Sequence, residues 1–161
     1  MINSEKPEKK IIGRVETVSF PELGIDNVHA RIDTGARTSA ISVSHTELEN
    51  GKLAVIFFDK NNAQYTGKKY YFDDFSHGMV ASSNGQAELR YKIRMLTTLG
   101  GKKIRARFTL ADRSMQTYPI LIGRNILRGK FIVDVKLGMP LKAEEKRRSN
   151  ELQQQIKRDS L

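Results

Sequence analysis

The sequence predicts an all-β protein made of many short, mainly antiparallel strands, and three observations support this class. Several segments alternate apolar and polar residues, as NVHARI does at positions 27–32, which is the pattern of a half-buried strand. Gly, Pro and Asn separate these segments, as they do between strands. Only the part after Pro140 is rich in helix formers and free of glycine. A barrel or a sandwich therefore fits better than an alternating βαβ fold.

The first strand candidates lie in the N-terminal half of the chain. They are KIIGRVETVS (10–19), NVHARID (27–33), TSAISV (38–43) and LAVIFFD (53–59). A loop that contains Pro and Gly separates the first two, and Gly35 turns the chain between the second and the third. In the second candidate, Val28, Ala30 and Ile32 fall on one face, which we expect to face the core.

A β-hairpin is the clearest local signal in the second half. Its arms are LRYKIRML (89–96) and KIRARFTL (103–110), and Gly100–Gly101 supplies the turn between them. One face of the arms is apolar and is the expected core face. It carries Leu89, Tyr91, Ile93, Met95, Ile104, Ala106, Phe108 and Leu110.

Shorter elements are expected on either side of this hairpin. Before it, KKYYFDD (68–74) predicts a strand and HGMVASSNGQ (77–86) is rich in turn residues. After it, YPILIG (118–123) predicts a strand, RNILRG (124–129) a single helical turn capped by Gly129, and KFIVDV (130–135) a last strand.

The composition excludes several kinds of function. The chain has no cysteine, which excludes disulfides and thiolate metal sites. No stretch approaches the ~18 consecutive apolar residues of a membrane span, and the N-terminus lacks the apolar run of a secretory signal. We therefore expect a cytoplasmic protein with no membrane partner. Lys and Arg number 28 against 18 Asp and Glu, a net charge of +10, which favours anionic partners without choosing among nucleic acid, lipid and acidic peptide.

Changes in composition divide the chain into three parts. We expect a flexible N-terminus over residues 1–10, one domain over residues 11–138, and a basic helical tail over residues 139–161. The tail has strong helix formers and few apolar residues, which indicates a solvated helix.

Asp33 lies between the alternating strand and Gly35, in the segment IDTGA (32–36). Asp, Thr and Gly are common turn residues, so the triplet alone is ordinary turn chemistry. An aspartic protease needs a carboxylate at such a tight loop, and a second carboxylate close enough to share one proton with it. The sequence holds a single Asp-Thr-Gly, so a shared proton requires a second copy of the chain.

Longer segments resemble the bacterial retropepsin-like aspartic peptidase family, whose members are often labelled ATP-dependent zinc proteases and are associated with RimK-type glutamate ligases. The resemblance rests on IIGRVETVSFPELGIDNVHARIDTGARTSAIS (11–42), VASSNGQAELR (80–90) and FTLADRSMQTYPILIGRNILRGKFIVD (108–134), which occur in the family's order. It implies an acid-protease barrel, closed or partly open, with a C-terminal helical tail. It also implies a RimB-like aspartic endopeptidase that acts as a homodimer on a glutamate-rich or glutamate-extended peptide or protein.

The resemblance also assigns roles to the residues of the Asp-Thr-Gly loop. Asp33 would supply half of the catalytic pair, and the Thr34 hydroxyl would connect the two loops of a dimer. Gly35 would let the backbone approach the carboxylates and would allow a positive φ. Far along the chain, Gly123 and Arg124 would be structural residues at the base of the dimer.

Substrate contacts are expected from two loops. Ala36 and Arg37 follow the catalytic triplet, and the Arg37 guanidinium has the shape to bind a carboxylate, although a solvated surface arginine is equally consistent with the sequence. Ser82, Ser83 and Asn84 would belong to a loop that covers the substrate, with ordinary turn chemistry as the alternative.

The mechanism implied by the resemblance needs no cofactor and no metal. The zinc and ATP of the family's label find no matching motif, since the chain has neither HExxH nor GxxxxGK[ST]. His29, His45 and His77 are not at ligand spacing.

Two other functions remain open from the sequence. A basic face of the predicted hairpin suggests a nucleic-acid-binding β module, although a solvated sheet face is the simpler interpretation and nucleic acid is not the expected partner. This face carries Arg90, Lys92, Arg94, Lys103, Arg105 and Arg107. The other alternative is a non-catalytic adaptor that has kept the retropepsin fold and its dimer, against which the intact Asp-Thr-Gly-Ala argues.

Overall fold

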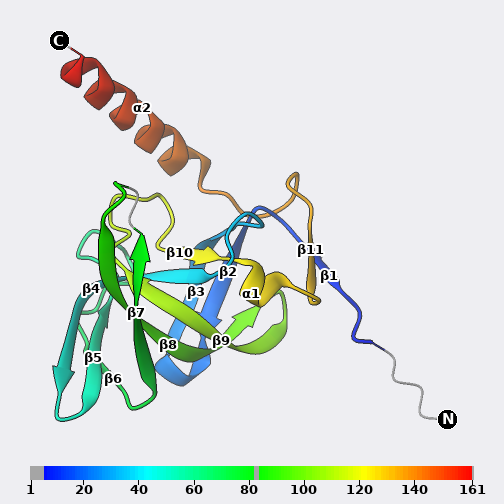
Figure 1. Cartoon of the computed structure of the whole chain (residues 1–161). Helices are drawn as coiled ribbons and strands as arrows, with labels where there is room; N and C mark the ends of the chain where they lie inside the picture. The colour runs from blue at the N-terminus through cyan, green and yellow to red at the C-terminus, as the bar shows by residue number, and fades with distance from the viewer. Residues whose placement is uncertain (1–5, 82–83, 161) are drawn as a thin grey trace.

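The computed structural model describes residues 6–81 and 84–160 and confirms the predicted all-β class with a C-terminal helix (Figure 1). The larger sheet contains β2 (Val15–Phe20), β3 (Ile25–Ile32), β4 (Ser39–Glu49), β5 (Lys52–Phe57), β6 (Tyr70–Phe72), β7 (Phe75–Ala81), β8 (Ala87–Leu99), β9 (Lys102–Ala111) and β10 (Ile120–Ile122). A second sheet pairs β1 (Lys10–Ile12) with β11 (Phe131–Val133). The helices are the 3-10 helix η1 (Pro21–Leu23), α1 (Arg124–Leu127) and α2 (Lys142–Asp159).

Part of the larger sheet closes on itself. Hydrogen-bonded neighbours run from β10 through β3, β2, β8 and β9 to β4, and β10 also pairs with β4. The strands therefore form a ring, which is the predicted barrel, while β5, β6 and β7 extend from it. Closure leaves the ring without exposed edges, which removes the sites at which strands of other chains could add.

The short strand β10 completes this ring between two strands that are far away in sequence. It runs parallel to β3, with Ile122 opposite Ile32, and antiparallel to β4, with Ile120 opposite Ile41. All four isoleucines are buried. The loop that connects β3 to β4 must therefore pass around the end of β10, and this loop contains the Asp-Thr-Gly triplet.

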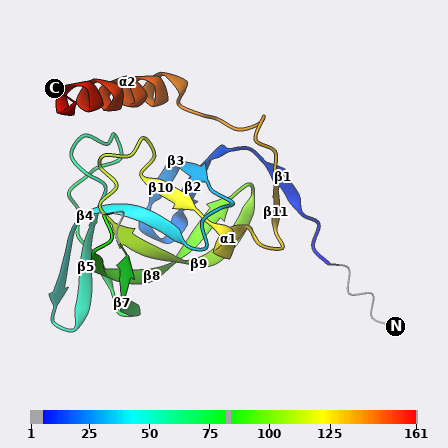
Figure 2. The ribbon, with the colours of Figure 1, turned by 45° about the horizontal axis from the view of Figure 1, so that its top comes forward.

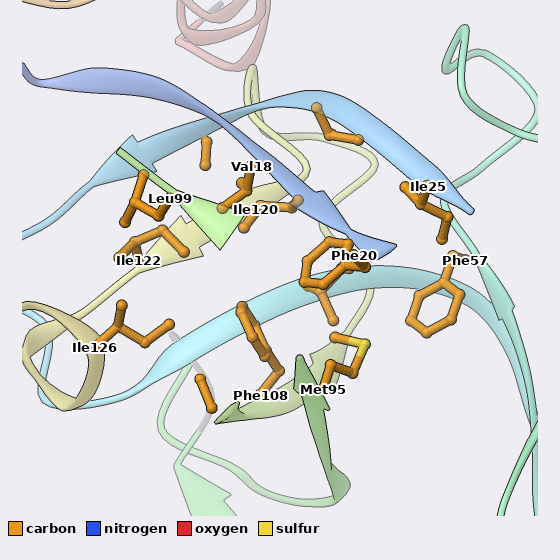
Figure 3. Close-up of a cluster of buried hydrophobic side chains, with 14 of the residues drawn as sticks. Val18, Phe20, Ile25, Phe57, Met95, Leu99, Phe108, Ile120, Ile122 and Ile126 are labelled. Atoms are coloured by element: carbon orange, nitrogen blue, oxygen red, sulfur yellow. The ribbon is translucent and has the colours of Figure 1, made fainter. Parts of the chain in front are cut away.

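Apolar side chains from nearly every strand fill the inside of the ring (Figure 3). Phe20 and Phe108 meet edge to face with their ring centroids 5.6 Å apart, the geometry that aromatic pairs prefer. The predicted core face of β3 is confirmed, because Val28, Ala30 and Ile32 are all buried.

The predicted hairpin forms with its turn at Gly100–Gly101, both of which have a positive φ. Its apolar face is buried at Ile93, Met95, Ala106, Phe108 and Leu110 and partly buried at Tyr91 and Ile104, but Leu89 is 53% exposed. The prediction was wrong for Leu89 because the first part of β8, residues 87–91, extends beyond the ring and pairs with β7 but not with β9. The segment expected to be mostly turn thus forms a strand up to Ala81, and the tip of this second hairpin follows it.

The single strand expected over residues 10–19 is divided into β1 and β2. A Cβ on Gly13 would lie 2.1 Å from the Leu137 carbonyl oxygen. The segment around Leu137 therefore crosses the chain between β1 and β2 in direct contact with the Gly13 backbone. The Arg14 N–H donates to that carbonyl, and the Met139 N–H donates to the Val15 carbonyl. This crossing replaces the strand pairing at that point, and nothing local in the sequence indicates it.

Helix α2 lies apart from the barrel in both views (Figures 1 and 2). None of its residues is buried, and Leu152 and Ile156 are exposed at 43% and 65%. Few contacts hold it in place, and they involve its start. The Leu141 N–H donates to the Tyr118 hydroxyl at 2.9 Å, and Arg14 donates two hydrogen bonds to Glu145. No helix among the described residues combines the length and the apolar character that crossing a membrane requires.

Candidate active site

Asp33 follows directly on the last residue of β3 and stays hydrogen-bonded to the ring. Its N–H donates to the Ile122 carbonyl at 2.8 Å, which continues the β3–β10 ladder by one residue. The side chain is partly buried. The carboxylate is therefore presented at the end of a strand whose position is set by buried neighbours.

The turn after Asp33 closes on its own carboxylate. The Gly35 N–H donates to Asp33 Oδ1 at 2.9 Å, and the Ala36 N–H donates to the Asp33 carbonyl at 3.2 Å. Such an Asx turn orients the carboxylate by a backbone donor. A Cβ on Gly35 would lie 3.2 Å from Asp33 Oδ1, so glycine allows this close approach. Gly35 does not use the positive φ that glycine allows, because its φ lies outside the left-handed region. Its closeness to Asp33 Oδ1 is the feature that favours glycine here.

The start of α1 holds the same loop from the other side. Arg124 Nη1 donates to the Thr34 carbonyl at 3.1 Å, and the Arg124 N–H donates to the Ala36 carbonyl at 2.8 Å. The Asn125 N–H donates to the Arg37 carbonyl at 3.2 Å. Arg124 and Asn125 thus satisfy three carbonyl groups of the Asp-Thr-Gly-Ala-Arg loop, which fixes the loop's backbone.

Two residues that the sequence did not single out connect this contact to the core. Ser39 Oγ is fully buried, accepts the Gly123 N–H at 2.9 Å and donates to Asn125 Oδ1 at 2.6 Å. Asn125 Nδ2 in turn donates to the Arg107 carbonyl at 3.0 Å. No local pattern marks Ser39 as special, because its partners come from the other end of the domain.

Gly123 is required by the closeness of the two loops. A Cβ there would lie 2.2 Å from the Thr38 carbonyl oxygen and 2.8 Å from that of Ala36. Both atoms are backbone, so neither can move aside cheaply. The Asp-Thr-Gly loop and the β10–α1 junction are in direct contact at this glycine.

The remaining predicted site residues lie at the surface. Thr34 and Arg37 are exposed beside Asp33, and Asn84 is exposed at the tip of the β7–β8 hairpin. Ser82 and Ser83 lie outside the described residues. The structure thus brings residues 33–37 together with Gly123 and Arg124, while Asn84 stands on a separate hairpin.

A pocket of about 530 Å³ opens beside Ile32, the neighbour of Asp33. Arginine side chains dominate its polar lining. They are Arg14, Arg31, Arg113 and Arg148. Burial lowers the pKa of the Arg113 guanidinium, and the charge of Arg31 lowers it further, whereas the charge of Asp33 raises it. The carboxylate of Asp33 is therefore near enough to Arg113 to affect it electrostatically.

Within the described ranges, no group of three or more His, Cys, Asp or Glu side chains is arranged to hold a metal ion. The site's chemistry rests on one carboxylate, a network of backbone donors and acceptors, and a neighbouring cationic pocket.

Comparison with known families gives one match over most of the chain. The matching family model is RimB-like, described as retropepsin-like aspartic endopeptidase RimB, and it covers residues 11–140. This range contains α1 and every described strand except for Lys10, the first residue of β1, and it excludes α2.

Curated relatives share the same region. A probable alpha-L-glutamate ligase from Shewanella pealeana (strain ATCC 700345 / ANG-SQ1) is 33% identical over 130 residues, which cover 78% of this chain and 28% of the relative. A probable alpha-L-glutamate ligase from Desulfotalea psychrophila (strain LSv54 / DSM 12343) is 30% identical over 142 residues, which cover 83% of this chain and 30% of the relative. The chain therefore spans less than a third of the length of these relatives.

Among solved structures, a protein with unknown function from Legionella pneumophila subsp. pneumophila str. Philadelphia 1 is similar. The TM-score is 0.63 at 22% sequence identity, and the similarity covers 82% of this chain and 98% of that one. At this identity the likeness concerns the fold.

Proposed function

Because the chain belongs to the RimB-like family of retropepsin-like aspartic endopeptidases, we propose that it hydrolyses peptide bonds with a water molecule activated by Asp33. The observation that carries the proposal is the position of this carboxylate. It ends β3, its N–H bonds to Ile122, and its Oδ1 accepts the Gly35 N–H. A carboxylate held in this way needs no rearrangement to face a substrate.

The mechanism requires two such carboxylates, and the second comes from another copy of the chain. Two carboxylates about 3 Å apart share one proton, because both cannot be ionised at that distance. The ionised one removes a proton from water, which attacks the amide carbonyl, and the protonated one donates to the carbonyl oxygen. Thr34 is exposed next to Asp33, where its hydroxyl is accessible to a partner loop.

Exposed apolar residues support the homodimer. Ile11 and Ile132 lie directly opposite each other in the β1–β11 sheet and are 57% and 53% exposed. Val135, in the segment that follows, is 75% exposed. Neighbouring exposed apolar side chains, as Ile11 and Ile132 are, are typical of an interface with another protein.

The proposed substrate is a glutamate-rich or glutamate-extended peptide or protein. The pocket beside Ile32 has four arginines in its lining and Glu145 as its single acidic residue, so its charge favours an acidic chain. The matched region of the curated relatives belongs to proteins named as probable alpha-L-glutamate ligases, which connects this domain with glutamate addition.

The test of catalysis is turnover of a glutamate-rich peptide by Asp33→Asn. The variant keeps the size of the side chain and one acceptor oxygen but cannot take a proton from water, so we expect hydrolysis to fall to the background rate. Asp26→Asn is the matched control, because Asp26 is exposed at the start of the same strand. Circular dichroism would establish that both variants fold. Full turnover by Asp33→Asn would remove Asp33 from the mechanism.

The test of the dimer is sedimentation over a range of concentrations. We expect Ile132→Glu to shift the protein to monomer and to abolish hydrolysis, since a charge on an apolar interface opposes association. Leu48→Glu is the control, because Leu48 is also exposed, at 55%, but lies on the β4–β5 hairpin. A wild-type protein that is monomeric and active at the same concentration would contradict the two-carboxylate mechanism.

One observation favours nucleic-acid binding as a second candidate. On the outer face of the β8–β9 hairpin, Arg94 lies directly opposite Arg107, and both are exposed. Like charges in this arrangement are destabilising, and phosphate groups would relieve the repulsion. Binding of a DNA or RNA oligonucleotide that weakens steeply with salt, and that Asp33→Asn leaves unchanged, would support this function.

A further inference from the structure

The pocket beside Asp33 is formed where the barrel meets the start of α2. On the barrel side it is lined by Arg31 and Ile32 of β3 and by Arg113 and Tyr118 of the β9–β10 loop. On the helix side it is lined by Glu145, Arg148, Ser149 and Leu152. Asp33 is not part of the lining, but it directly follows Ile32 and its charge acts on Arg113, so a ligand in this pocket lies near the carboxylate of the proposed mechanism.

The cations of the pocket are only partly balanced by the chain's own carboxylates. Arg148 contacts Glu151 at 3.5 Å on the helix, and Arg14 binds Glu145. In the described part of the chain, neither Arg31 nor Arg113 forms an ion pair. Arg113 is partly buried, and its Nε donates only to the Tyr118 carbonyl, at 3.3 Å. A partly buried guanidinium with free donors is a strong site for a carboxylate.

A carboxylate of the protein itself already occupies one side of this pocket. Glu145 accepts hydrogen bonds from both terminal nitrogens of Arg14, at 2.8 and 2.9 Å. This contact lowers the pKa of Glu145, and the positive charge of Arg31 contributes in the same direction. The lining therefore favours an ionised glutamate side chain, and a glutamate of a bound peptide has the same chemistry.

We propose that Arg14, Arg31 and Arg113 form a carboxylate-binding subsite for a glutamate side chain of the substrate, and that Glu145 of α2 competes for this subsite from within the same chain. The subsite places a substrate glutamate beside the scissile bond, so it rests on the proposed function for its role in hydrolysis. Binding of the acidic chain, however, does not depend on turnover.

The competition follows from how α2 is held. Its contacts with the barrel are at its start, through Leu141 and Glu145, and none of its residues is buried. An acidic substrate that takes over the Arg14 guanidinium therefore displaces one of the few interactions that position the helix. The helix then moves away from the pocket at little energetic cost.

The experiment measures binding without hydrolysis. In the full-length Asp33→Asn protein, fluorescence anisotropy of labelled hexaglutamate is compared with that of labelled hexaglutamine. We expect hexaglutamate to bind and Arg31→Gln to weaken it roughly tenfold, as loss of a charge-assisted hydrogen bond predicts. Arg31 is exposed on β3, so its replacement does not disturb the core.

Arg113 tests the same subsite from the loop. Arg113→Gln is expected to weaken hexaglutamate binding roughly tenfold, and Arg113→Lys, which keeps the charge, to weaken it less. Arg94→Gln is the matched control, because it removes one positive charge from a residue that does not line this pocket. Equal losses from Arg94→Gln, Arg31→Gln and Arg113→Gln would mean that net charge alone attracts the peptide, and would overturn the subsite.

Glu145→Gln tests the competition. Since an ion pair of this exposure contributes little, we expect the variant to bind hexaglutamate about two- to fivefold more tightly. Glu144→Gln removes the same negative charge one residue earlier, at a position outside this pocket. It therefore measures how much the change in net charge alone affects hexaglutamate binding. Identical affinities for the two variants would refute the competition. If the pocket variants behave as expected but the wild-type chain hydrolyses no peptide, the subsite stands and the proposed hydrolysis fails.

Discussion

Replacing Ser39 with alanine removes a single hydroxyl group that connects the two halves of the candidate site. In the native protein this hydroxyl is fully buried between the Gly123 N–H, at 2.9 Å, and Asn125 Oδ1, at 2.6 Å. Alanine fills almost the same space, so the packing of β4 is retained. The Gly123 N–H, however, loses its acceptor in a buried position.

The expected cost follows from these two hydrogen bonds. A buried donor left without a partner costs about 1–3 kcal/mol. Asn125 loses less, because its Nδ2 still donates to the Arg107 carbonyl. We therefore expect the free energy of unfolding to fall by about 2–3 kcal/mol, which for a domain of this size lowers the melting temperature by roughly 5–10 °C.

Urea denaturation followed by far-UV circular dichroism gives the free energy of unfolding. The peptide-hydrolysis assay gives the effect of the substitution on the candidate site. Ser44→Ala is the control on the same strand, since Ser44 is exposed and its hydroxyl contacts the Ile56 carbonyl only at 3.5 Å. If Ser39→Ala unfolds within about 0.5 kcal/mol of the wild type, the hydroxyl does not hold the loops together and the reasoning is wrong.

Three further predictions concern the backbone, the helix and the core. Gly123→Ala should fail to fold or lose at least about 3 kcal/mol of the free energy of unfolding in urea, because its Cβ would lie 2.2 Å from a backbone carbonyl oxygen. Gly78→Ala, whose Cβ would have no atom within 4 Å, should leave the stability unchanged. The Arg14 guanidinium lowers the pKa of Glu145, so this ion pair contributes fully above the ordinary glutamate pKa and is lost as the pH falls through the lowered value. Proteolysis or hydrogen exchange of α2 should accelerate in that acid range, and Glu145→Gln should abolish the pH dependence. Phe108→Ala should cost about 3–5 kcal/mol on thermal unfolding, since the ring is fully buried against Phe20; a loss under 1 kcal/mol would contradict the described core.

The sequence was informative wherever the signal was local. The alternation of Val28, Ala30 and Ile32 identified the strand that leads to Asp33, and the Gly100–Gly101 turn identified the hairpin. These patterns depend on neighbours along the chain, so a single segment is enough to recognise them.

The sequence contained no indication of contacts between residues that lie far apart along the chain. Ser39 and Asn125 are 86 residues apart, and nothing near either residue indicates the other. The division of the first strand at Gly13 depends on Leu137, and the pocket depends on Arg113 of the β9–β10 loop lying near the end of β3 at Ile32. Such contacts arise from the closed ring and from the crossing chain, which local patterns do not encode. Resemblance to a family supplied the importance of Asp33, since the triplet alone was ordinary turn chemistry.

The insertion of β10 between β3 and β4 also determines when, during synthesis of the chain, the Asp33 loop can reach its folded shape. Arg124 and the carbonyl that it binds, that of Thr34, are separated by 90 residues. At a synthesis rate of about 5–20 residues per second, the ribosome makes the carboxylate loop roughly 5–20 seconds before it makes the strand and the turn that shape it. A nascent chain thus carries Asp33 early but in an unformed loop. The loop that presents this carboxylate therefore takes its final shape only when the domain is almost fully translated.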